Sequence, residues 1–107
     1  MLPIIQQVAI EFKTQLLQLY GNEFAELILF GSYARGDNHE ESGLDFIVIL
    51  YNPNLRTSAE IPKTSVISSR LSLKYGLMLS TLPISLFKLQ TSMQGVYQAI
   101  RREGIVI

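Results

Sequence analysis

Two short segments of the chain carry the residue types that handle phosphate groups. Gly31 and Ser32 follow an apolar run, and ten residues further on come Gly43, Leu44 and Asp45. A glycine allows the backbone to turn sharply and to approach a ligand without interference from a Cβ atom. A helical turn that begins near Ser32 would direct free N–H groups at an anion, and the Ser32 hydroxyl adds a further donor. We therefore predict a phosphate-binding turn at this point.

The second segment predicts a cation site that has only one of its two expected carboxylates. Positions 43 and 45 are two apart on an expected strand, so their side chains leave the same face. Two carboxylates there would hold divalent cations against a triphosphate, as two-metal phosphoryl chemistry requires. This chain supplies Asp45 but has Gly43 at the other position. Arg35, shortly after the turn, is a candidate partner for a phosphate, and its alternative interpretation is a solvated surface arginine.

The composition limits the classes of function. A chain of 107 residues, 48% of them hydrophobic, suits a single domain, which we expect to span 1–107. Nine basic residues balance nine acidic ones, which argues against non-specific binding to a nucleic-acid backbone. The absence of cysteine excludes disulfides and thiolate metal sites. The apolar runs are too short to span a bilayer and no signal peptide is evident, so we expect no membrane association and a cytoplasmic location.

The periodicity of apolar residues predicts alternating helices and strands. Turn and cap signals predict the boundaries between these elements. We expect helices over Ile4–Tyr20, about Ala59–Tyr75 with Pro62 in its first turn, a short one capped by Ser85, and Met93–Glu103. Strands are expected over Ala25–Phe30, Leu44–Tyr51 and Leu77–Leu82, with Ile105–Ile107 as either an edge strand or an apolar tail. This alternation predicts an α/β (α+β) domain with a small, mixed, twisted sheet flanked by helices.

The segment from about Leu27 to Leu50 resembles the minimal nucleotidyltransferases of prokaryotes, relatives of the DNA polymerase β superfamily. The family pattern is Gly-Ser, ten residues, Asp, any residue, Asp. By this resemblance Gly31 and Ser32 match the nucleotide-phosphate positions, Asp45 matches the second metal ligand, and Gly43 stands where the first ligand is expected. Lower-specificity resemblance continues through Ser72–Gly76 and Arg101–Gly104, so that it covers most of the chain.

The resemblance implies a biological role. Many members of the family are antitoxins paired with a helical HEPN ribonuclease toxin, and active members transfer AMP from ATP, with Mg²⁺, onto a tyrosine of that toxin. Two hypotheses follow for this chain. It is either an antitoxin that binds and adenylylates its partner, or a pseudoenzyme that neutralises or scaffolds the partner by binding alone. Nucleotide transfer to a small molecule is a weaker third possibility, because such enzymes usually carry an additional substrate-binding domain.

The metal-binding carboxylates decide between these hypotheses. The family pattern implies a third acid on the expected strand Leu77–Leu82, but the candidate positions Gly76, Met78 and Ser80 contain none. Loss of one charge-stabilising group from a preorganised site commonly slows catalysis roughly 100- to 1000-fold. Glu40 and Glu41 are the nearest acids that could substitute by rearrangement of their loop. We therefore predict impaired catalysis by the chain as it stands.

Overall fold

A computed structural model describes residues 1–39 and 42–107, so that Glu40 and Glu41, the suggested substitute ligands, lie outside the described residues. A four-stranded mixed sheet forms its centre, in the order β3-β2-β1-β4. Strand β1 pairs antiparallel with both β2 and β4, whereas β2 and β3 are parallel. The strands are β1 (Phe24–Phe30), β2 (Leu44–Leu50), β3 (Leu79–Ser85) and β4 (Ile105–Val106).

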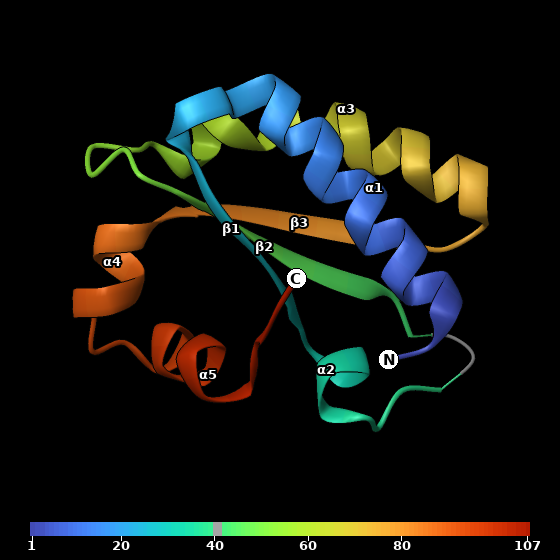
Figure 1. Ribbon diagram of the computed structural model, residues 1–107. Coiled ribbons are helices and arrows are strands. Elements are labelled where there is room, and N and C mark those ends of the chain that lie inside the picture. The colour runs from blue at the N-terminus through green and yellow to red at the C-terminus, as the bar shows by residue number, and fades with distance from the viewer. Residues whose placement is uncertain (40–41) are drawn as a thin grey trace.

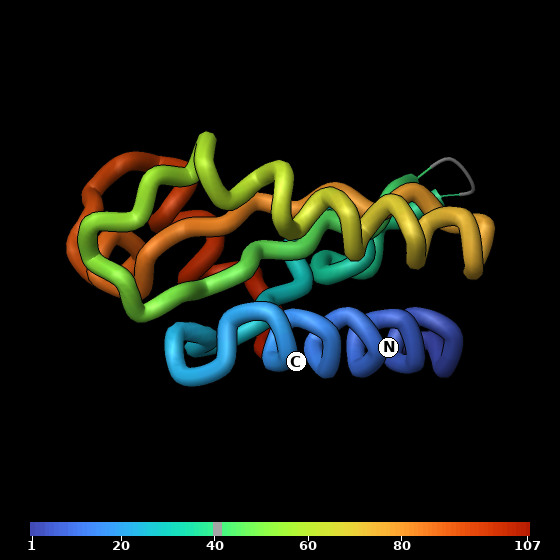
Figure 2. Tube along the Cα trace, turned by 90° about the horizontal axis from the view of Figure 1, so that it is seen from above, coloured from blue at the N-terminus to red at the C-terminus, as the bar shows by residue number. Residues whose placement is uncertain are grey.

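Helices cover both faces of this sheet (Figure 1). Helices α1 (Pro3–Tyr20) and α3 (Thr57–Tyr75) lie on one face, alongside each other in the view from above (Figure 2). The short helices α4 (Leu86–Thr91) and α5 (Gly95–Glu103) lie on the other face, and α2 (Ser32–Arg35) follows β1 at the end of the sheet. A 3₁₀ turn, η1 (Gly21–Glu23), joins α1 to β1.

Two apolar clusters hold these layers together. The larger one lies between the sheet and helices α1 and α3, and includes Phe12, whose ring meets the edge of Phe46 at 5.3 Å. The smaller one lies on the opposite face, where Ile47 and Ile49 of β2 pack with Ile100 of α5. Side chains alternate along β2, so its even-numbered apolar residues enter the first cluster and its odd-numbered ones the second. Each strand residue is thereby assigned to a face.

The predicted fold class is confirmed, with local differences in the boundaries. Strand β3 begins and ends later than expected, because its pairing partner β2 continues to Leu50 and is matched by Ser85. Helix α3 begins at Thr57, so Pro62 lies beyond its first turn rather than within it, where it removes one N–H donor from the helix. Residues Ile105–Val106 form the edge strand rather than a tail, and Ser85 caps α4 by accepting a hydrogen bond from Lys88 N at 3.1 Å.

The described part of the chain contains no helix that is both long enough and apolar enough to cross a membrane.

Candidate nucleotide site

The site lies where β1 ends and β2 begins, on the face covered by α5. In the sheet register Phe30 pairs with Asp45, and Asp45 pairs with Ser80 of β3. These three positions therefore form a row across three strands. Two residues further along β2 and β3 from Asp45 and Ser80 lie apolar side chains of the smaller cluster, so the carboxylate and the hydroxyl lie on the α5 side of the sheet.

Gly31 and Asp45 are in close contact. The backbone of Gly31 has φ 82° and ψ −154°, a combination that is essentially restricted to glycine. A Cβ atom at this position would lie 2.5 Å from Oδ2 of Asp45. Glycine is therefore needed at this position for two reasons. It permits the turn into α2, and its lack of a Cβ atom leaves room for the carboxylate of Asp45. The predicted phosphate turn and the predicted carboxylate are thus adjacent in space, as their spacing in the sequence indicates.

The pocket at this point has a polar end and apolar walls. It has a volume of about 270 Å³, and Gly31, Asp45, Ser80 and Thr81 line it together with apolar residues. Two of the apolar residues, Val96 and Ile100, come from α5. They are four residues apart and so lie on the same face of that helix. The sequence predicts this helix but not its packing against the pocket, because that packing depends on the path of the chain.

Burial perturbs the one carboxylate in the pocket. Asp45 is partly enclosed, and this desolvation raises the pKa of its carboxyl group above the ordinary value of 3.8, while the charge of Arg35 lowers it to a smaller extent. A titratable group with a perturbed pKa in a pocket is typical of a functional site, although structural groups show such shifts as well.

Arg35 lies at the end of α2, and its side chain approaches α5. Its Nε donates a hydrogen bond to Asp37 Oδ2 at 3.1 Å, and its Nη1 lies 4.0 Å from Glu103 Oε2. The side chain remains 43% exposed. Glu103 was not among the candidate residues, because it is far from Arg35 in the sequence and only the return of the chain through α5 brings the two together.

Ser32 and Gly43 lie at the margin of the site. Ser32 is the first residue of α2 and is partly exposed, and it is not among the residues that line the pocket. Gly43 immediately precedes β2, where Leu44 N donates a hydrogen bond to Met78 O at 2.8 Å. Its φ is not positive, so the backbone does not require glycine there. A Cβ atom on Gly43 would lie 3.1 Å from Met78 O, a tight but feasible fit.

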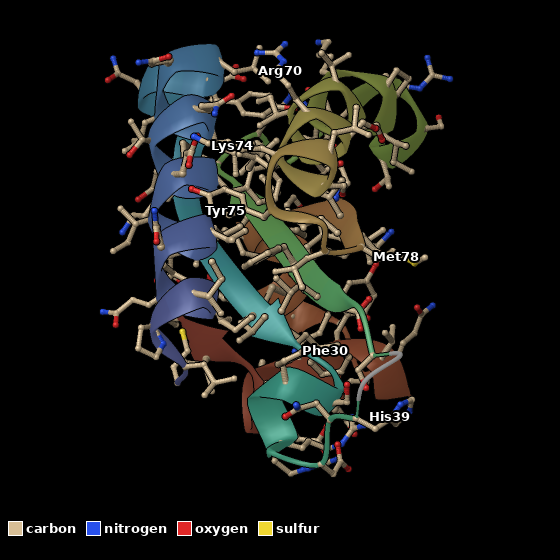
Figure 3. All side chains as sticks on the ribbon, turned by 90° about the vertical axis from the view of Figure 1, so that its right-hand side faces the viewer. Phe30, His39, Arg70, Lys74, Tyr75 and Met78 are labelled. Carbon is tan, nitrogen blue, oxygen red and sulfur yellow. The ribbon has the colours of Figure 1, made fainter. Side chains whose placement is uncertain are left out.

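Other polar side chains of the predicted sites and of α3 lie away from the pocket. His39 is exposed in the loop after α2, and its backbone N–H donates to Ser42 Oγ at 2.9 Å. Figure 3 shows Phe30, which lines the pocket, at the end of β1, Met78 just before β3, and Lys74 and Tyr75 directed towards α1. In the part of the chain that the structure describes, no three His, Asp or Glu side chains converge in a way that could hold a metal ion.

These residues do not fit the two-metal centre that the sequence resemblance implies. At the three positions that face the pocket or its margin in this register, the chain has Gly43, Asp45 and Ser80. One carboxylate is too few to bridge two cations, which need several oxygen ligands each. Within residues 1–39 and 42–107, no acid takes the place of the other two.

The mixed sheet, with a glycine turn beside a strand carboxylate, agrees with the nucleotidyltransferase fold that the sequence resemblance implies. The chain belongs to the nucleotidyltransferase domain family, whose family model matches residues 9–102. Two proteins of Methanocaldococcus jannaschii, each bearing the name "Putative protein adenylyltransferase", are similar in sequence. One is 39% identical over 77 residues, which cover 71% of this chain and 75% of that protein. The other is 32% identical over 72 residues, which cover 67% of this chain and 65% of that protein.

Two crystal structures share the fold. A toxin-antitoxin with AMP-PNP superposes with a TM-score of 0.60 at 19% identity, over 90% of this chain and 69% of the other. A mutant of the toxin-antitoxin MntA-HpeT superposes with a TM-score of 0.58 at 17% identity, with the same coverage. At this identity the likeness establishes the fold. The bound AMP-PNP and the toxin–antitoxin assembly belong to those proteins.

Proposed function

We propose that this chain is a nucleotide-binding antitoxin that neutralises a HEPN-type ribonuclease toxin by binding it, with little or no transfer of AMP. The observation that carries the proposal is the single carboxylate at the start of β2. Asp45 has Gly43 two residues before it and Ser80 beside it on β3, and neither of these residues is an acid. The toxin–antitoxin structures with this fold support the partner class, and the AMP-PNP in one of them supports the nucleotide.

The residues of the pocket, and Ser32 and Arg35 at its margin, have distinct roles in this proposal. Gly31 and Ser32 would seat the phosphates, with Arg35 as an additional cation, and the apolar walls would receive the rest of the nucleotide. Asp45 is the one carboxylate at a metal-ligand position, and by itself it does not supply the several oxygen ligands that a magnesium ion needs. Without the other two acids the attacking hydroxyl and the leaving group are not both stabilised. Binding of the nucleotide is therefore retained while chemistry is lost.

Transfer of AMP onto the partner is the second candidate. It is favoured by the sequence similarity to two proteins named as adenylyltransferases, one at 39% identity. Catalysis of phosphoryl transfer rests largely on positioning and charge stabilisation, so a residual rate is compatible with one carboxylate. The two candidates differ in the measured transfer of label.

A comparison of designed variants tests the proposal. The purified chain is incubated with its co-encoded partner, α-³²P-ATP and Mg²⁺, beside Gly43→Asp, Gly43→Ala and the double variant Gly43→Asp with Ser80→Asp. Ser80 is exposed and pairs with Asp45, so an acid is accommodated there. Gly43→Ala adds the same Cβ atom without a charge and is the matched control for the tight contact with Met78 O.

We expect neutralisation and complex formation with the unmodified chain without labelling of the partner, and labelling with the double variant. From the effect of single charge-stabilising groups, the restored rate should exceed that of the unmodified chain by roughly 100-fold or more. Labelling by the unmodified chain at the rate of the double variant would show that AMP transfer is its activity. Failure to bind any HEPN-type partner would overturn the antitoxin role itself.

A further inference from the structure

The shortage of carboxylates at the pocket has a consequence for how a nucleotide is held. In a two-metal site, acids bind cations and the cations bind the phosphates, so an acidic site attracts an anionic ligand. Here Asp45 stands between an uncharged Gly43 and an uncharged Ser80. Mg²⁺ gives up its bound water reluctantly, and a single carboxylate offers too few ligands to compensate for the loss of that water. The positive charge must then come from the protein.

We infer that this chain binds the polyphosphate of a nucleotide without a divalent cation, and that Arg35 supplies the positive charge. This inference rests on the proposed nucleotide site. Arg35 is not among the residues that line the pocket, but it lies one helical turn from Gly31, which does line it, and Arg35 N donates a hydrogen bond to Gly31 O at 3.1 Å. Its planar guanidinium can bind a phosphate through two parallel hydrogen bonds, which a lysine ammonium cannot.

The present partners of Arg35 leave it able to bind a ligand. Its Nε is bonded to Asp37, whereas Nη1 is 4.0 Å from Glu103, which is beyond hydrogen-bonding distance. The side chain is 43% exposed, so a phosphate can reach it from solvent. Exposed ion pairs of this kind contribute little to stability, so exchanging Glu103 for a phosphate costs little.

The inference reverses the expected effect of changing Asp45. If a cation joins Asp45 to the phosphates, Asp45→Asn weakens binding of the nucleotide. If no cation is present, the negative charge of Asp45 faces negative phosphates, and Asp45→Asn tightens binding because it removes this repulsion. Asparagine has nearly the same shape as aspartate, so the contact with Gly31 is preserved. The sign of this change therefore separates the two modes of binding.

The experiment measures the affinity for ribose-labelled fluorescent ATP by anisotropy, in EDTA and in Mg²⁺. For the unmodified chain we expect dissociation constants within about twofold of each other, because the protein then makes no contact that requires the cation. Arg35→Ala should weaken binding about tenfold or more, the scale of a lost charge-assisted hydrogen bond. Arg102→Ala is the matched control, because Arg102 also pairs with Glu103, at 3.6 Å, and is 69% exposed. It should leave the affinity unchanged.

The double variant Gly43→Asp with Ser80→Asp provides the complementary test. Two additional acids should make binding of the labelled ATP depend on Mg²⁺, and the affinity in EDTA should fall below that of the unmodified chain. Binding by the unmodified chain in Mg²⁺ but not in EDTA, together with weaker binding by Asp45→Asn, would overturn the inference and leave the proposed nucleotide site intact. Absence of binding under both conditions would overturn the inference and the nucleotide site, whereas neutralisation of the partner would still be tested by the separate binding assay.

Discussion

At the scale of the residue, Gly31 couples the backbone of the turn to the side chain of Asp45. Its positive φ and extended ψ exclude other residues, and the carboxylate occupies the space where a Cβ atom would lie, 2.5 Å from Oδ2. Gly36 also has a positive φ, of 80°, but a Cβ atom added there would meet nothing within 4 Å. Alanine at Gly36 would therefore introduce backbone strain alone, whereas alanine at Gly31 would also displace the carboxylate of Asp45.

We predict that Gly31→Ala lowers the free energy of unfolding by about 1–3 kcal/mol, the cost of a strained backbone region, and also weakens nucleotide binding. Gly36→Ala should show destabilisation without the loss of binding. Chemical denaturation and the anisotropy assay measure the two effects. Equal loss of binding by both variants would show that the contact between Gly31 and Asp45 has no part in the site.

The spacing of Gly31, Ser32, Gly43 and Asp45 predicted their place near one another, because a turn and the start of a neighbouring strand are fixed by local signals. The expected strand Leu77–Leu82 also brought Ser80 into consideration. That Ser80 is the position beside Asp45 follows only from the parallel register, which depends on where α3 returns the chain to the sheet. The approach of Glu103 to Arg35 likewise has no local signal.

At the scale of the element, α1 and α3 are joined at their outer surface by a polar cluster. Glu11 Oε1 accepts a hydrogen bond from Lys74 Nζ at 2.7 Å, and Glu11 Oε2 accepts one from the hydroxyl of Tyr75. Figure 3 shows Lys74 and Tyr75 on α3 facing α1. The hydrogen bond from Lys74, followed by that from Tyr75, lowers the pKa of Glu11 below its ordinary value of 4.5.

We predict that Glu11→Gln reduces stability slightly at neutral pH. Because the folded-state pKa of Glu11 is depressed, its stabilising effect is present above pH 4.5 and is lost as the pH falls through the lowered pKa. The melting temperatures of the variant and the unmodified chain should therefore converge in acid. Lys63→Gln, which breaks a 3.3 Å pair with Glu60 within α3 alone, is the control for a lost surface ion pair. A difference that persists at acid pH would contradict this account.

The turn from α5 into β4 depends on Gly104. A Cβ atom there would lie 2.5 Å from Ile28 Cγ2 and 2.7 Å from Ile100 O, so helix and strand can meet this closely only at a glycine. We predict that Gly104→Ala costs about 1–3 kcal/mol of unfolding free energy through overpacking. Gly95→Ala, at the open start of the same helix, should be neutral or slightly stabilising. Equal unfolding midpoints in urea for the two variants would refute the close packing.

The helices and strands themselves were largely predictable from periodicity and from Gly, Pro and Ser signals at their ends. The errors have a common cause. Strand β3 was placed too early because its apolar residues begin at Leu77, whereas pairing with β2 selects Leu79–Ser85. The choice between an edge strand and a tail for Ile105–Val106 was also made by pairing, here with Ile28 and Leu29 of β1. Local patterns locate apolar runs, but only the assembled sheet decides which residues pair.

At the scale of the whole molecule, the sheet separates the face covered by α1 and α3 from the face on which the pocket opens. Helices α1 and α3 cover the larger apolar cluster, whereas the pocket opens on the other face, with walls formed by the sheet and by Val96 and Ile100 of α5. Arg35 and Glu103 approach each other across α2 and α5 on that same side. A ligand in the pocket therefore contacts the elements of one face and leaves those of the other free of direct contact.

We predict that ATP slows amide hydrogen exchange in α2, at the start of β2 and in α5, and leaves exchange in α1 and α3 unchanged. Ordering of a helix that forms a pocket wall reduces its local opening, while helices that only pack on the opposite side gain no new contacts. Mass spectrometry of peptides from the full chain, with and without ATP in EDTA, measures both sets together. The Arg35→Ala variant is the control, since the same ATP concentration should protect its α5 much less. Protection centred on α1 and α3 would place the nucleotide on the opposite face of the sheet from Asp45.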